Sequence, residues 1–476
     1  MPLKNFANTK ILATIGPATD SVETISALID AGIDGVRLNM SHGSLENFEE
    51  LFTTIHNVCV KRSTPLAVLA DLQGPKIRVG DLEEKEIYLS QNDKVEITTE
   101  DILGTREKIS CNYKNLPHDA DIDDKILIDD GLIKLKVVEI KDKSVVCKII
   151  EGGVLKPRKG MNMPGMKLRM SSITEKDKTD LKFLLKHRVD FIALSFVREA
   201  KDIYELKELL KKENVTKQVI AKIEKPEAVK NFDEILKAAD GIMVARGDLG
   251  VEMDPQDVPI IQKEIIRKCR AVGKLVITAT QMMESMIKNP IPTRAEASDV
   301  ANAVWDGTDV VMLSAETSIG KFPVESVKVM NDILQKSESQ HNYFSKHDFD
   351  IPDDLESNLF DSTGMAITEI TKRVNTDYVI IFTHKGRKAK AVIKYRPPCP
   401  VIVFSDSFET LNILNLHHGT YPLFKEGFDL EETVIEKSLA LLKRKKIIRK
   451  NDVLLFASGA PYTDLDRKNW NRFVVV

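Results

Sequence analysis

Charged side chains follow two apolar segments of this chain, at the positions where each segment ends. The first segment, residues 219–224, contains Lys222 and Glu224, and the second ends in Arg246 and Asp248. Buried parallel strands are continuous apolar runs, and α/β enzymes place their chemistry at the carboxyl ends of such strands. Two carboxylates there can hold a divalent cation, and a neighbouring lysine can stabilise migrating negative charge. The pattern indicates phosphoryl or enolate chemistry on a metal.

Short apolar runs recur along the chain and alternate with amphipathic stretches such as residues 201–210. Eight strands alternating with helices are typical of a (β/α)₈ TIM barrel, so we predict this fold. The runs are residues 10–15, 35–39, 65–71, 191–195, those beginning at 219 and 241, 274–280 and 309–314.

A gap of about 120 residues separates the third run from the fourth, far more than an ordinary connection. Its Val/Ile-rich alternation, with two strands expected around Asp-Asp-Gly in residues 125–137, predicts an inserted small β-barrel that acts as a lid. A polar linker and further strand and helix patterns after residue 340 predict a C-terminal α/β domain with a mainly parallel sheet. The predicted domains are residues 1–73 and 170–342 for the barrel, 74–169 for the lid and 343–476 for the C-terminal domain.

The bulk composition excludes several classes of protein. The chain has 476 residues, so roughly two to four domains are expected. A net charge of −3 argues against nucleic-acid and membrane-surface partners. The sequence predicts no transmembrane run and no signal peptide, and we expect a cytoplasmic protein. Scattered cysteines without a CxxC motif indicate reduced thiols and no zinc site. They are Cys59, Cys111, Cys147, Cys269 and Cys399.

Further reactive residue types follow the other predicted strands: Arg37-Leu-Asn-Met-Ser-His42, Asp71-Leu-Gln-Gly-Pro-Lys-Ile-Arg78, Thr280 and Ser314-Ala-Glu316. Together with residues 243–250, 279–286 and 292–303, this set closely resembles the pyruvate kinase family. The resemblance is dense from residue 9 to about 335 and looser to the end. It implies magnesium-dependent transfer of phosphate from phosphoenolpyruvate to ADP, which gives pyruvate and ATP.

The resemblance also implies roles for individual residues at the metal and substrate. Glu224 and Asp248 would bind Mg²⁺ or Mn²⁺, and Lys222 would lie against the transferring phosphoryl group. Arg37 would bind phosphate. The substrate carboxylate would lie on the N–H groups of Gly247 and Asp248 and on the hydroxyl of Thr280. Without the resemblance, a buried network pairing the acids with Lys222 and Arg246 explains them equally well.

The proton donor to enolpyruvate does not stand out in the sequence. Our hypothesis is a water relayed by Thr280, Ser314 and Glu316. For the nucleotide, the resemblance implies contacts from Arg78 and His42, with Lys159 reaching in from the lid.

A monovalent-cation site is the first departure from the commonest family pattern. Many members bind K⁺ through residues that match Asn39, Ser41, Asp71 and the carbonyl of Leu72, and carry glutamate where this chain has Lys76. An ammonium group there could replace the cation, so we predict that K⁺ is dispensable. The alternative is that Lys76 points to solvent and the ion site still fills.

The second departure is the loop after the first strand of the C-terminal domain. Members activated by sugar phosphates have a hydroxyl- and glycine-rich loop here, whereas this chain has several basic residues. We predict a phosphorylated effector at this strand-to-helix turn; the alternative is a charged turn without a ligand. The effector residues would be Thr383, His384, Lys385, Gly386, Arg387 and Lys388. The resemblance also implies a homotetramer.

Two other functions remain as alternatives. One is a different TIM-barrel enzyme acting on phosphoenolpyruvate or pyruvate, such as an aldolase or lyase; the lid and Lys159 argue against it. The other is a non-catalytic homologue that senses metabolites, although the intact Lys222, Glu224, Asp248 and Thr280 argue for turnover.

Overall fold

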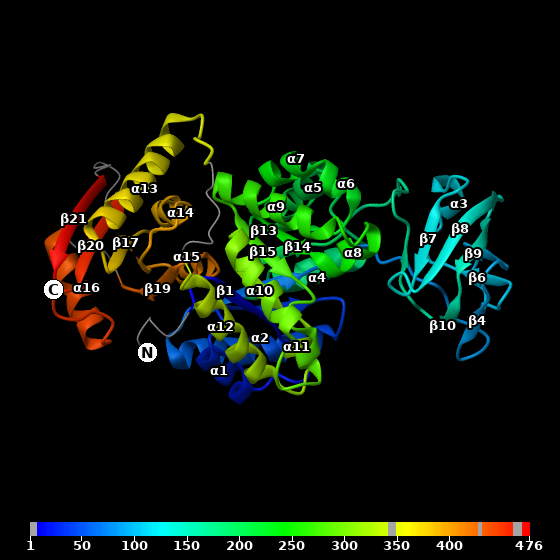
Figure 1. The fold of residues 1–476 in the computed structure, drawn as a ribbon, viewed down its shortest axis with the longest axis horizontal. Coiled ribbons are helices and arrows are strands. Elements are labelled where there is room, and N and C mark those ends of the chain that lie inside the picture. Colours follow the sequence, from blue (N-terminus) through cyan, green and yellow to red (C-terminus); the bar gives the residue numbers. More distant parts are fainter. Residues whose placement is uncertain (1–6, 341–348, 427–430, 460–468) are drawn as a thin grey trace.

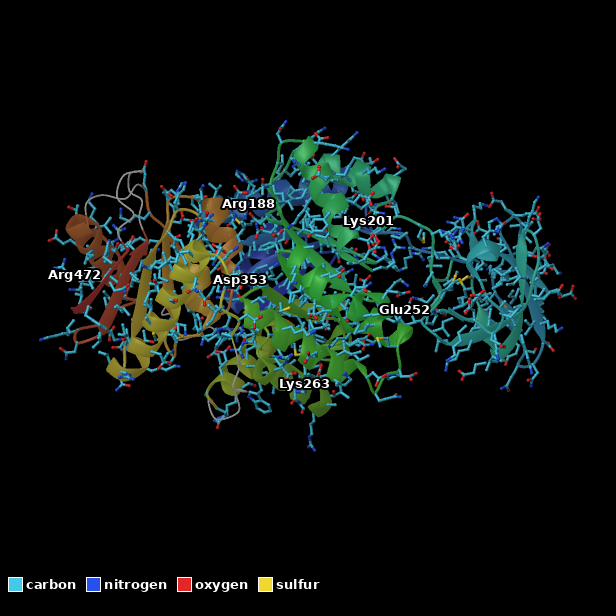
Figure 2. All side chains as sticks on the ribbon, turned by 90° about the horizontal axis from the view of Figure 1, so that it is seen from above. Arg188, Lys201, Glu252, Lys263, Asp353 and Arg472 are labelled. Atoms are coloured by element: carbon cyan, nitrogen blue, oxygen red, sulfur yellow. The ribbon has the colours of Figure 1, made fainter. Side chains whose placement is uncertain are left out.

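The computed structural model describes residues 7–340, 349–426, 431–459 and 469–476. Figure 1 shows three parts in a row, with a helix-covered barrel in the middle, the all-β lid on one side and an α/β domain on the other. Figure 2 shows the same order after a quarter turn. Within the described ranges, no helix has the length and apolar character that a membrane crossing needs.

Eight parallel strands close the central barrel in the order β1-β16-β15-β14-β13-β12-β3-β2. The predicted (β/α)₈ barrel is therefore confirmed, and each strand lies in or beside a predicted run. The strands are β1 Lys10–Thr14, β2 Gly35–Asn39, β3 Ala67–Asp71, β12 Phe191–Leu194, β13 Gln218–Ile223, β14 Gly241–Ala245, β15 Leu275–Ala279 and β16 Val310–Leu313.

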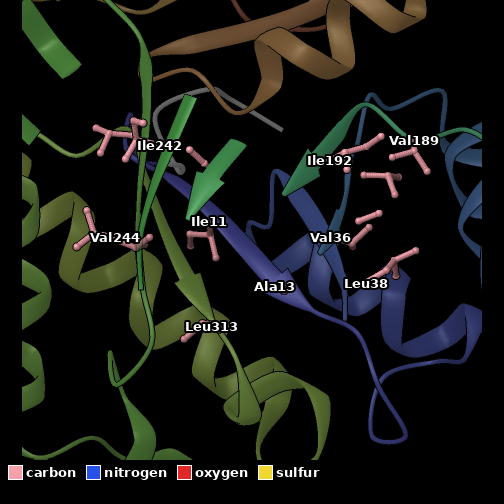
Figure 3. Packing of buried hydrophobic residues seen from close by; sticks show 14 of the residues in the cluster. Ile11, Ala13, Val36, Leu38, Val189, Ile192, Ile242, Val244 and Leu313 are labelled. Carbon is pink, nitrogen blue, oxygen red and sulfur yellow. The ribbon is translucent and has the colours of Figure 1, made fainter. Parts of the chain in front are cut away.

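Helices surround the barrel and bury its outer face. The alternation of side chains along each strand makes two cores. Ile11, Ala13 and Val36 point outward to the helices (Figure 3), whereas Leu12 and Leu69 fill the interior. The helices are α1 Val22–Ala31, α2 Leu45–Arg62, α4 Glu175–Leu184, α5 Ala200–Lys212, α6 Pro226–Lys230, α7 Phe232–Ala238, α8 Arg246–Glu252, α9 Val258–Val272, α10 Arg294–Asp306, α11 Ala315–Ser318 and α12 Pro323–Glu338, with a 3₁₀ turn η2 at Glu284–Ile287.

The inserted segment is all-β apart from one short helix, α3 Leu116–Asp119. One sheet has the order β11-β7-β8-β9-β5-β6 and a second pairs β10 with β4. The hairpin expected in residues 125–137 is confirmed, because β7 and β8 pair antiparallel. The exact domain boundaries remain predictions, and the one at 342/343 lies outside the described residues. The strands are β4 Ile87–Leu89, β5 Lys94–Thr98, β6 Lys108–Ser110, β7 Lys125–Ile128, β8 Ile133–Ile140, β9 Ser144–Glu151, β10 Gly153–Leu155 and β11 Met161–Asn162.

The C-terminal domain is built on a five-stranded sheet of order β19-β18-β17-β20-β21. The sheet is parallel except at β21, which confirms the mainly parallel prediction. The sequence analysis did not anticipate β19, which contains Pro422, or the antiparallel edge strand β21. The elements are α13 Leu355–Val374, β17 Tyr378–Phe382, α14 Arg387–Lys394, β18 Val401–Ser405, α15 Phe408–Asn415, β19 Thr420–Phe424, α16 Glu431–Arg444, β20 Val453–Gly459 and β21 Asn469–Val475.

The C-terminal domain closes the amino end of the barrel. Leu416, just after α15, belongs to the apolar cluster inside the barrel. Arg396, just after α14, donates to the carbonyl of Gly307 at 2.6 Å and to Asp309 Oδ1 at 2.9 Å. Burial raises the pKa of Asp309 although Arg396 opposes this rise. The junction therefore combines a buried apolar side chain, Leu416, with the largely buried ion pair of Arg396 and Asp309.

We expect Arg396→Met to lower the free energy of unfolding by about 3 kcal/mol, because the substitution removes the guanidinium that forms an ion pair with the largely buried Asp309. Denaturation followed by fluorescence gives a reporter in each part, since Trp305 lies in the barrel and Trp470 in the C-terminal sheet. The control is Arg267→Met, which removes an exposed pair with Glu264 and should change stability by less than about 1 kcal/mol. Equal midpoints for the two variants would contradict the prediction.

Candidate active site

The carboxyl ends of the barrel strands and the base of the lid enclose a cavity. Several residues that the sequence places in one site meet on its wall, although they come from different strands. The predicted residues on the wall are Arg37, Asn39, Ser41, His42, Asp71, Lys76, Lys222, Glu224 and Asp248. The predicted residues that do not line it are Leu72, Arg78, Lys159, Gly247, Thr280, Ser314 and Glu316.

A chain of alternating charges crosses the floor of the cavity. Arg37 donates from Nε and Nη2 to Asp71 Oδ2 at 2.8 and 2.6 Å. Lys222 Nζ lies 3.2 Å from the other oxygen of Asp71 and 2.7 Å from Glu224 Oε1. Lys222 also donates to Ser195 Oγ at 2.7 Å. The residues of β2, β3 and β13 thus form one buried network.

Burial and charge act in opposite directions on these groups. Burial alone would lower the pKa of Lys222, but Asp71, Glu224 and Asp248 together raise it. Burial would raise the pKa of Asp71, but Lys222 and Arg37 hold it below its ordinary value. Lys222 is therefore a permanent cation at neutral pH, as electrostatic stabilisation of a transferring group requires.

Glu224 and Asp248 form an acidic pair whose negative charge is only partly offset by Lys222. Burial raises the pKa of Glu224, and the like charge of Asp248 raises it further, while Lys222 opposes both. A divalent cation between them would remove this repulsion, and hard cations prefer such oxygen ligands. In the described part of the chain no cluster of three or more His, Cys, Asp or Glu side chains could hold a metal. The donor set fits Mg²⁺ if substrate oxygens and water complete the coordination.

Thr280 lies beside this pair at the end of β15. Its Oγ1 accepts from the N–H of Gly247 at 2.7 Å and donates to the carbonyl of Ala279 at 2.6 Å. The Gly247 N–H that we expect to hold a substrate carboxylate is therefore engaged by Thr280 in this structure. To bind a substrate carboxylate, the Gly247 N–H would have to exchange its hydrogen bond to Thr280 for one to the substrate.

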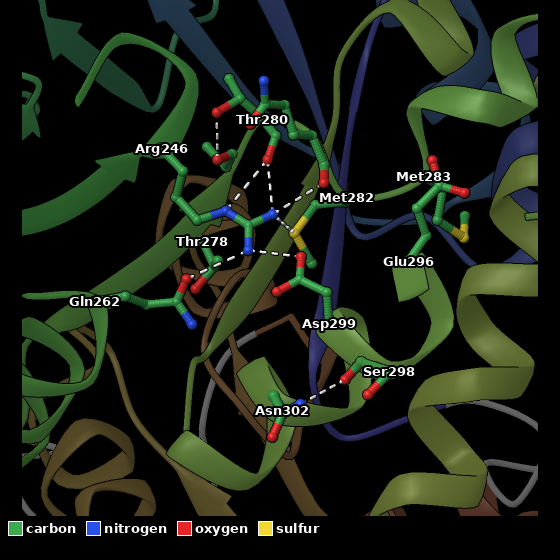
Figure 4. Close-up of polar contacts among 12 residues, drawn as sticks. Arg246, Gln262, Thr278, Thr280, Met282, Met283, Glu296, Ser298, Asp299 and Asn302 are labelled. Carbon is green, nitrogen blue, oxygen red and sulfur yellow. Dashed lines mark hydrogen bonds and ion pairs between the residues drawn. The ribbon is translucent and has the colours of Figure 1, made fainter. Parts of the chain in front are cut away.

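Arg246 holds the backbone at Thr280 (Figure 4). Its Nη2 donates to the carbonyls of Thr280 and Gln281 at 2.7 and 3.2 Å, and its Nη1 pairs with Asp299 at 2.6 Å. Gln262 accepts from the same nitrogen at 3.3 Å. Arg246, which the sequence places among chemically active residues, therefore anchors a loop. Asp299 lies in one of the family-like motifs, and nothing local in the sequence indicates its partner.

Ser314 and Glu316 lie at the end of β16. Glu316 accepts from the backbone N–H of Ser314 at 2.7 Å and of Met283 at 3.1 Å. Burial raises its pKa. Ser314 Oγ is buried without a hydrogen-bond partner among the described residues. The two residues are neighbours, but no hydrogen bond among the described residues connects them to the Thr280 hydroxyl.

The predicted nucleotide residues lie where the lid joins the barrel. Lys159 pairs with Asp129 at 2.8 Å, and Arg78 Nη1 donates to the carbonyl of Arg158 at 2.9 Å. His42 lines the cavity from the barrel side. His42 therefore lies on the cavity wall, whereas the charged groups of Arg78 and Lys159 contact other lid residues.

The predicted monovalent-cation ligands also converge. Asn39, Ser41 and Asp71 line the cavity, while the carbonyl of Leu72 accepts from Ser195 Oγ at 2.8 Å. Lys76 lies on the same wall with an exposed side chain. Ser195 was missed in the sequence because a serine at a strand end carries no distinctive signal.

The predicted effector residues lie in the C-terminal domain, apart from the cavity, at the turn between β17 and α14. Thr383 Oγ1 accepts from the N–H of Gly386 at 2.9 Å, and His384 pairs with Asp406 at 2.6 Å. Lys388 is buried and donates to the carbonyl of Ser458 at 2.6 Å; burial lowers its pKa to about 8.

Comparison with known proteins identifies the family. Residues 6–327 match the pyruvate kinase barrel domain, and residues 361–472 match the pyruvate kinase alpha/beta domain. The chain belongs to the pyruvate kinase family. It is a phosphotransferase with the activity of that family, transfer of phosphate from phosphoenolpyruvate to ADP, and the family depends on a divalent metal.

Individual relatives agree with this assignment. Pyruvate kinase of Staphylococcus aureus (strain MRSA252) is 40% identical over 470 residues, which cover 98% of this chain and 80% of that protein. Pyruvate kinase of Staphylococcus epidermidis is 40% identical over 455 residues, which cover 95% and 78%. A crystal structure of a pyruvate kinase from Cryptosporidium parvum superposes with a TM-score of 0.91 at 36% identity, covering 99% of this chain and 96% of that one.

We expect Glu224→Gln to weaken Mn²⁺ binding on the order of tenfold to a hundredfold, because a neutral amide replaces one of two anionic ligands. Titration of free Mn²⁺ by electron paramagnetic resonance measures this without turnover. Glu213→Gln, at the exposed end of α5, is the matched control and should bind Mn²⁺ as the wild type does. Unchanged affinity in Glu224→Gln would place the metal elsewhere.

Proposed function

We propose that this pyruvate kinase family enzyme uses Mg²⁺, or Mn²⁺, held by Glu224 and Asp248, and that the transferred phosphate lies between Arg37 and Lys222. The observation that carries the proposal is the position of Lys222 Nζ, 2.7 Å from Glu224 and 3.2 Å from Asp71. The metal would neutralise charge on the phosphoryl oxygens and the enolate.

The residues of the chain supply positioning and electrostatics. Arg37, oriented by Asp71, presents a planar guanidinium to the phosphate. Lys222 stabilises negative charge as it moves from the phosphoryl group to the enolate oxygen. The N–H groups of Gly247 and Asp248 and the Thr280 hydroxyl orient the substrate carboxylate, once the Gly247–Thr280 bond is exchanged. ADP would enter between His42 on the barrel and Arg78 and Lys159 on the lid.

Protonation of enolpyruvate follows phosphoryl transfer. The proton would come from a water relayed by Thr280, Ser314 and Glu316. The support is local: Ser314 Oγ is buried with no partner in the described ranges, and Glu316 is a buried carboxyl group whose pKa is raised by that burial.

Thr280→Val removes the hydroxyl of the relay while keeping a β-branched side chain. We expect solvent-deuterium incorporation at C3 of pyruvate to slow by on the order of a hundredfold, which is a typical contribution of general acid–base catalysis. Exchange followed by NMR measures this step without ADP. Exchange at the wild-type rate would remove Thr280 from the relay.

The Lys76 ammonium group could replace K⁺ beside the phosphate. Support comes from its place on the cavity wall with Asn39, Ser41 and Asp71. In this interpretation Leu72 does not need to bind an ion, because its carbonyl already accepts from Ser195. If Lys76 instead points to solvent during turnover, K⁺ would still bind.

We expect pyruvate formation from phosphoenolpyruvate and ADP with Mg²⁺ and tetramethylammonium as the only other cation. Lys76→Glu should make turnover dependent on K⁺, since it removes the fixed cation and adds a carboxylate. Steady-state rates with and without K⁺ test both statements. A wild-type enzyme that requires K⁺ would keep the Mg²⁺ proposal and overturn the role of Lys76. An absence of turnover under both conditions would count against the proposed site.

The regulatory and cellular properties are further parts of the proposal. A phosphorylated effector would bind at residues 383–388, where α14 begins and several basic side chains gather, and Lys385 would be available to it. We also propose a homotetramer and a cytoplasmic location, both inferred from the family. The C-terminal position of the effector segment, apart from the cavity, is consistent with regulation at a distance.

A further inference from the structure

The two chain segments that connect the lid to the barrel pair with each other. The N–H of Val79 donates to the carbonyl of Lys159 at 2.9 Å, and the N–H of Met161 donates to that of Ile77 at 2.9 Å. We call residues 76–80 and 158–162 the lid ribbon. Because the ribbon carries Lys76, Arg78 and Lys159, its angle decides where these three cations lie relative to the barrel.

A carboxylate of the barrel holds the base of this ribbon. Asn162 Nδ2 donates to Glu252 Oε1 at 2.8 Å. Glu252 is the last residue of α8, the helix whose first turn contains Gly247 and Asp248. Figure 2 places Glu252 at the edge of the barrel that faces the lid. The contact therefore joins the ribbon to the element that carries the predicted metal and substrate groups.

The same oxygen of Glu252 also binds a buried lysine. Lys225 Nζ lies 2.8 Å from Glu252 Oε1, and the two side chains are 8% and 2% exposed. Lys225 follows Glu224 in sequence, and its ammonium lies 5.5 Å from the centre of the Phe196 ring. Hydrogen bonds to a charged, buried acceptor are stronger than neutral ones, so this junction resists bending.

We infer that Glu252 is a positioning residue, which fixes the lid ribbon through Asn162 at the distance from the barrel where Arg78 and Lys159 meet the nucleotide. Lys225 pairs with the same oxygen of Glu252 that accepts from Asn162 and so helps to hold the carboxylate in place. Arg37 and Lys222 are held instead by Asp71, Glu224 and Ser195. The inference rests on the proposed nucleotide site and adds to it a residue that separates nucleotide binding from phosphoenolpyruvate binding.

Asn162→Asp tests the contact by placing a carboxylate against Glu252. We expect KM for ADP to rise about tenfold, the worth of one hydrogen bond to a charged group. KM for phosphoenolpyruvate and Mn²⁺ affinity should change less than KM for ADP, because Asn162 bonds to Glu252 and not to Glu224 or Lys222, although it lies on the same cavity wall. Glu252→Gln should show the same split, since Lys225 then loses its counter-charge.

The double variant Asn162→Asp/Glu252→Gln exchanges the two groups. The new amide can donate to the new carboxylate, which also supplies the negative charge that Lys225 needs. We expect KM for ADP to return to within about threefold of wild type. The control is Glu151→Gln, which removes a lid ion pair with Lys134 (3.0 Å) that does not reach the barrel; it should leave both KM values unchanged.

The angle of the lid can be measured without substrates, so this readout does not depend on the nucleotide site. The five native cysteines are buried, so fluorophores can be attached at Leu132→Cys on the lid and Tyr204→Cys on α5. Both positions are exposed, at 71% and 54%. Energy transfer in labelled chains diluted with unlabelled protein should give a broader distance distribution in each single variant than in the wild type. The double variant should narrow it again.

Equal distance distributions in all the proteins, or an absence of rescue by the double variant, would overturn the positioning role. A uniform loss of activity for both substrates would also overturn it, because a purely structural contact acts on both. A broadened distance distribution with an unchanged KM for ADP would support the role of Glu252 in positioning the ribbon. It would also show that ADP does not bind to the ribbon residues.

Discussion

Lys222 is the cation on which the rest of the site depends, since it contacts the carboxylates of two other residues at once. Removing Asp71, Lys222 and Glu224 from water costs free energy that their mutual attraction offsets only while all three are in place. Their positions are set by the strands, since Asn39 is in register with Asp71 and Lys222 with Met243. A closed barrel has no free edge, so no strand can slip without disturbing every other.

The two flanking parts join the barrel in different ways. At the amino end, Leu416 and the Arg396–Asp309 pair bury the C-terminal domain against the barrel. At the carboxyl end, the lid has its own apolar core and joins the barrel through a narrow ribbon. In the proposed role of Glu252, one part-buried hydrogen bond at the base of this ribbon fixes the position of the whole lid. The Glu252 contact should therefore affect the position of the lid more than the many exposed ion pairs on the lid surface do.

Much of the barrel could be predicted from the sequence, because each strand is an apolar run and each functional group follows one directly. Lys222 and Glu224 are visible for this reason. By contrast, β19 contains Pro422, a residue that usually argues against a strand. The partnership of Lys225 with Glu252 depends on how the ends of β13 and α8 meet in space, and no local pattern encodes that distance. The same holds for Ser195, whose role follows only from its contact with Lys222.

The backbone at the end of β15 shows why a chemically suggestive residue can be structural. Thr280 and Gln281 both have positive φ, at 65° and 54°, and for a β-branched residue this conformation costs on the order of 1–3 kcal/mol. Arg246 holds both carbonyls, and Asp299 fixes the guanidinium from the opposite side. The strained turn aims the Thr280 hydroxyl at the Gly247 N–H instead of along the strand. Arg246 therefore acts on the proposed substrate site through the backbone. Its guanidinium group is already paired with Asp299 before any substrate binds.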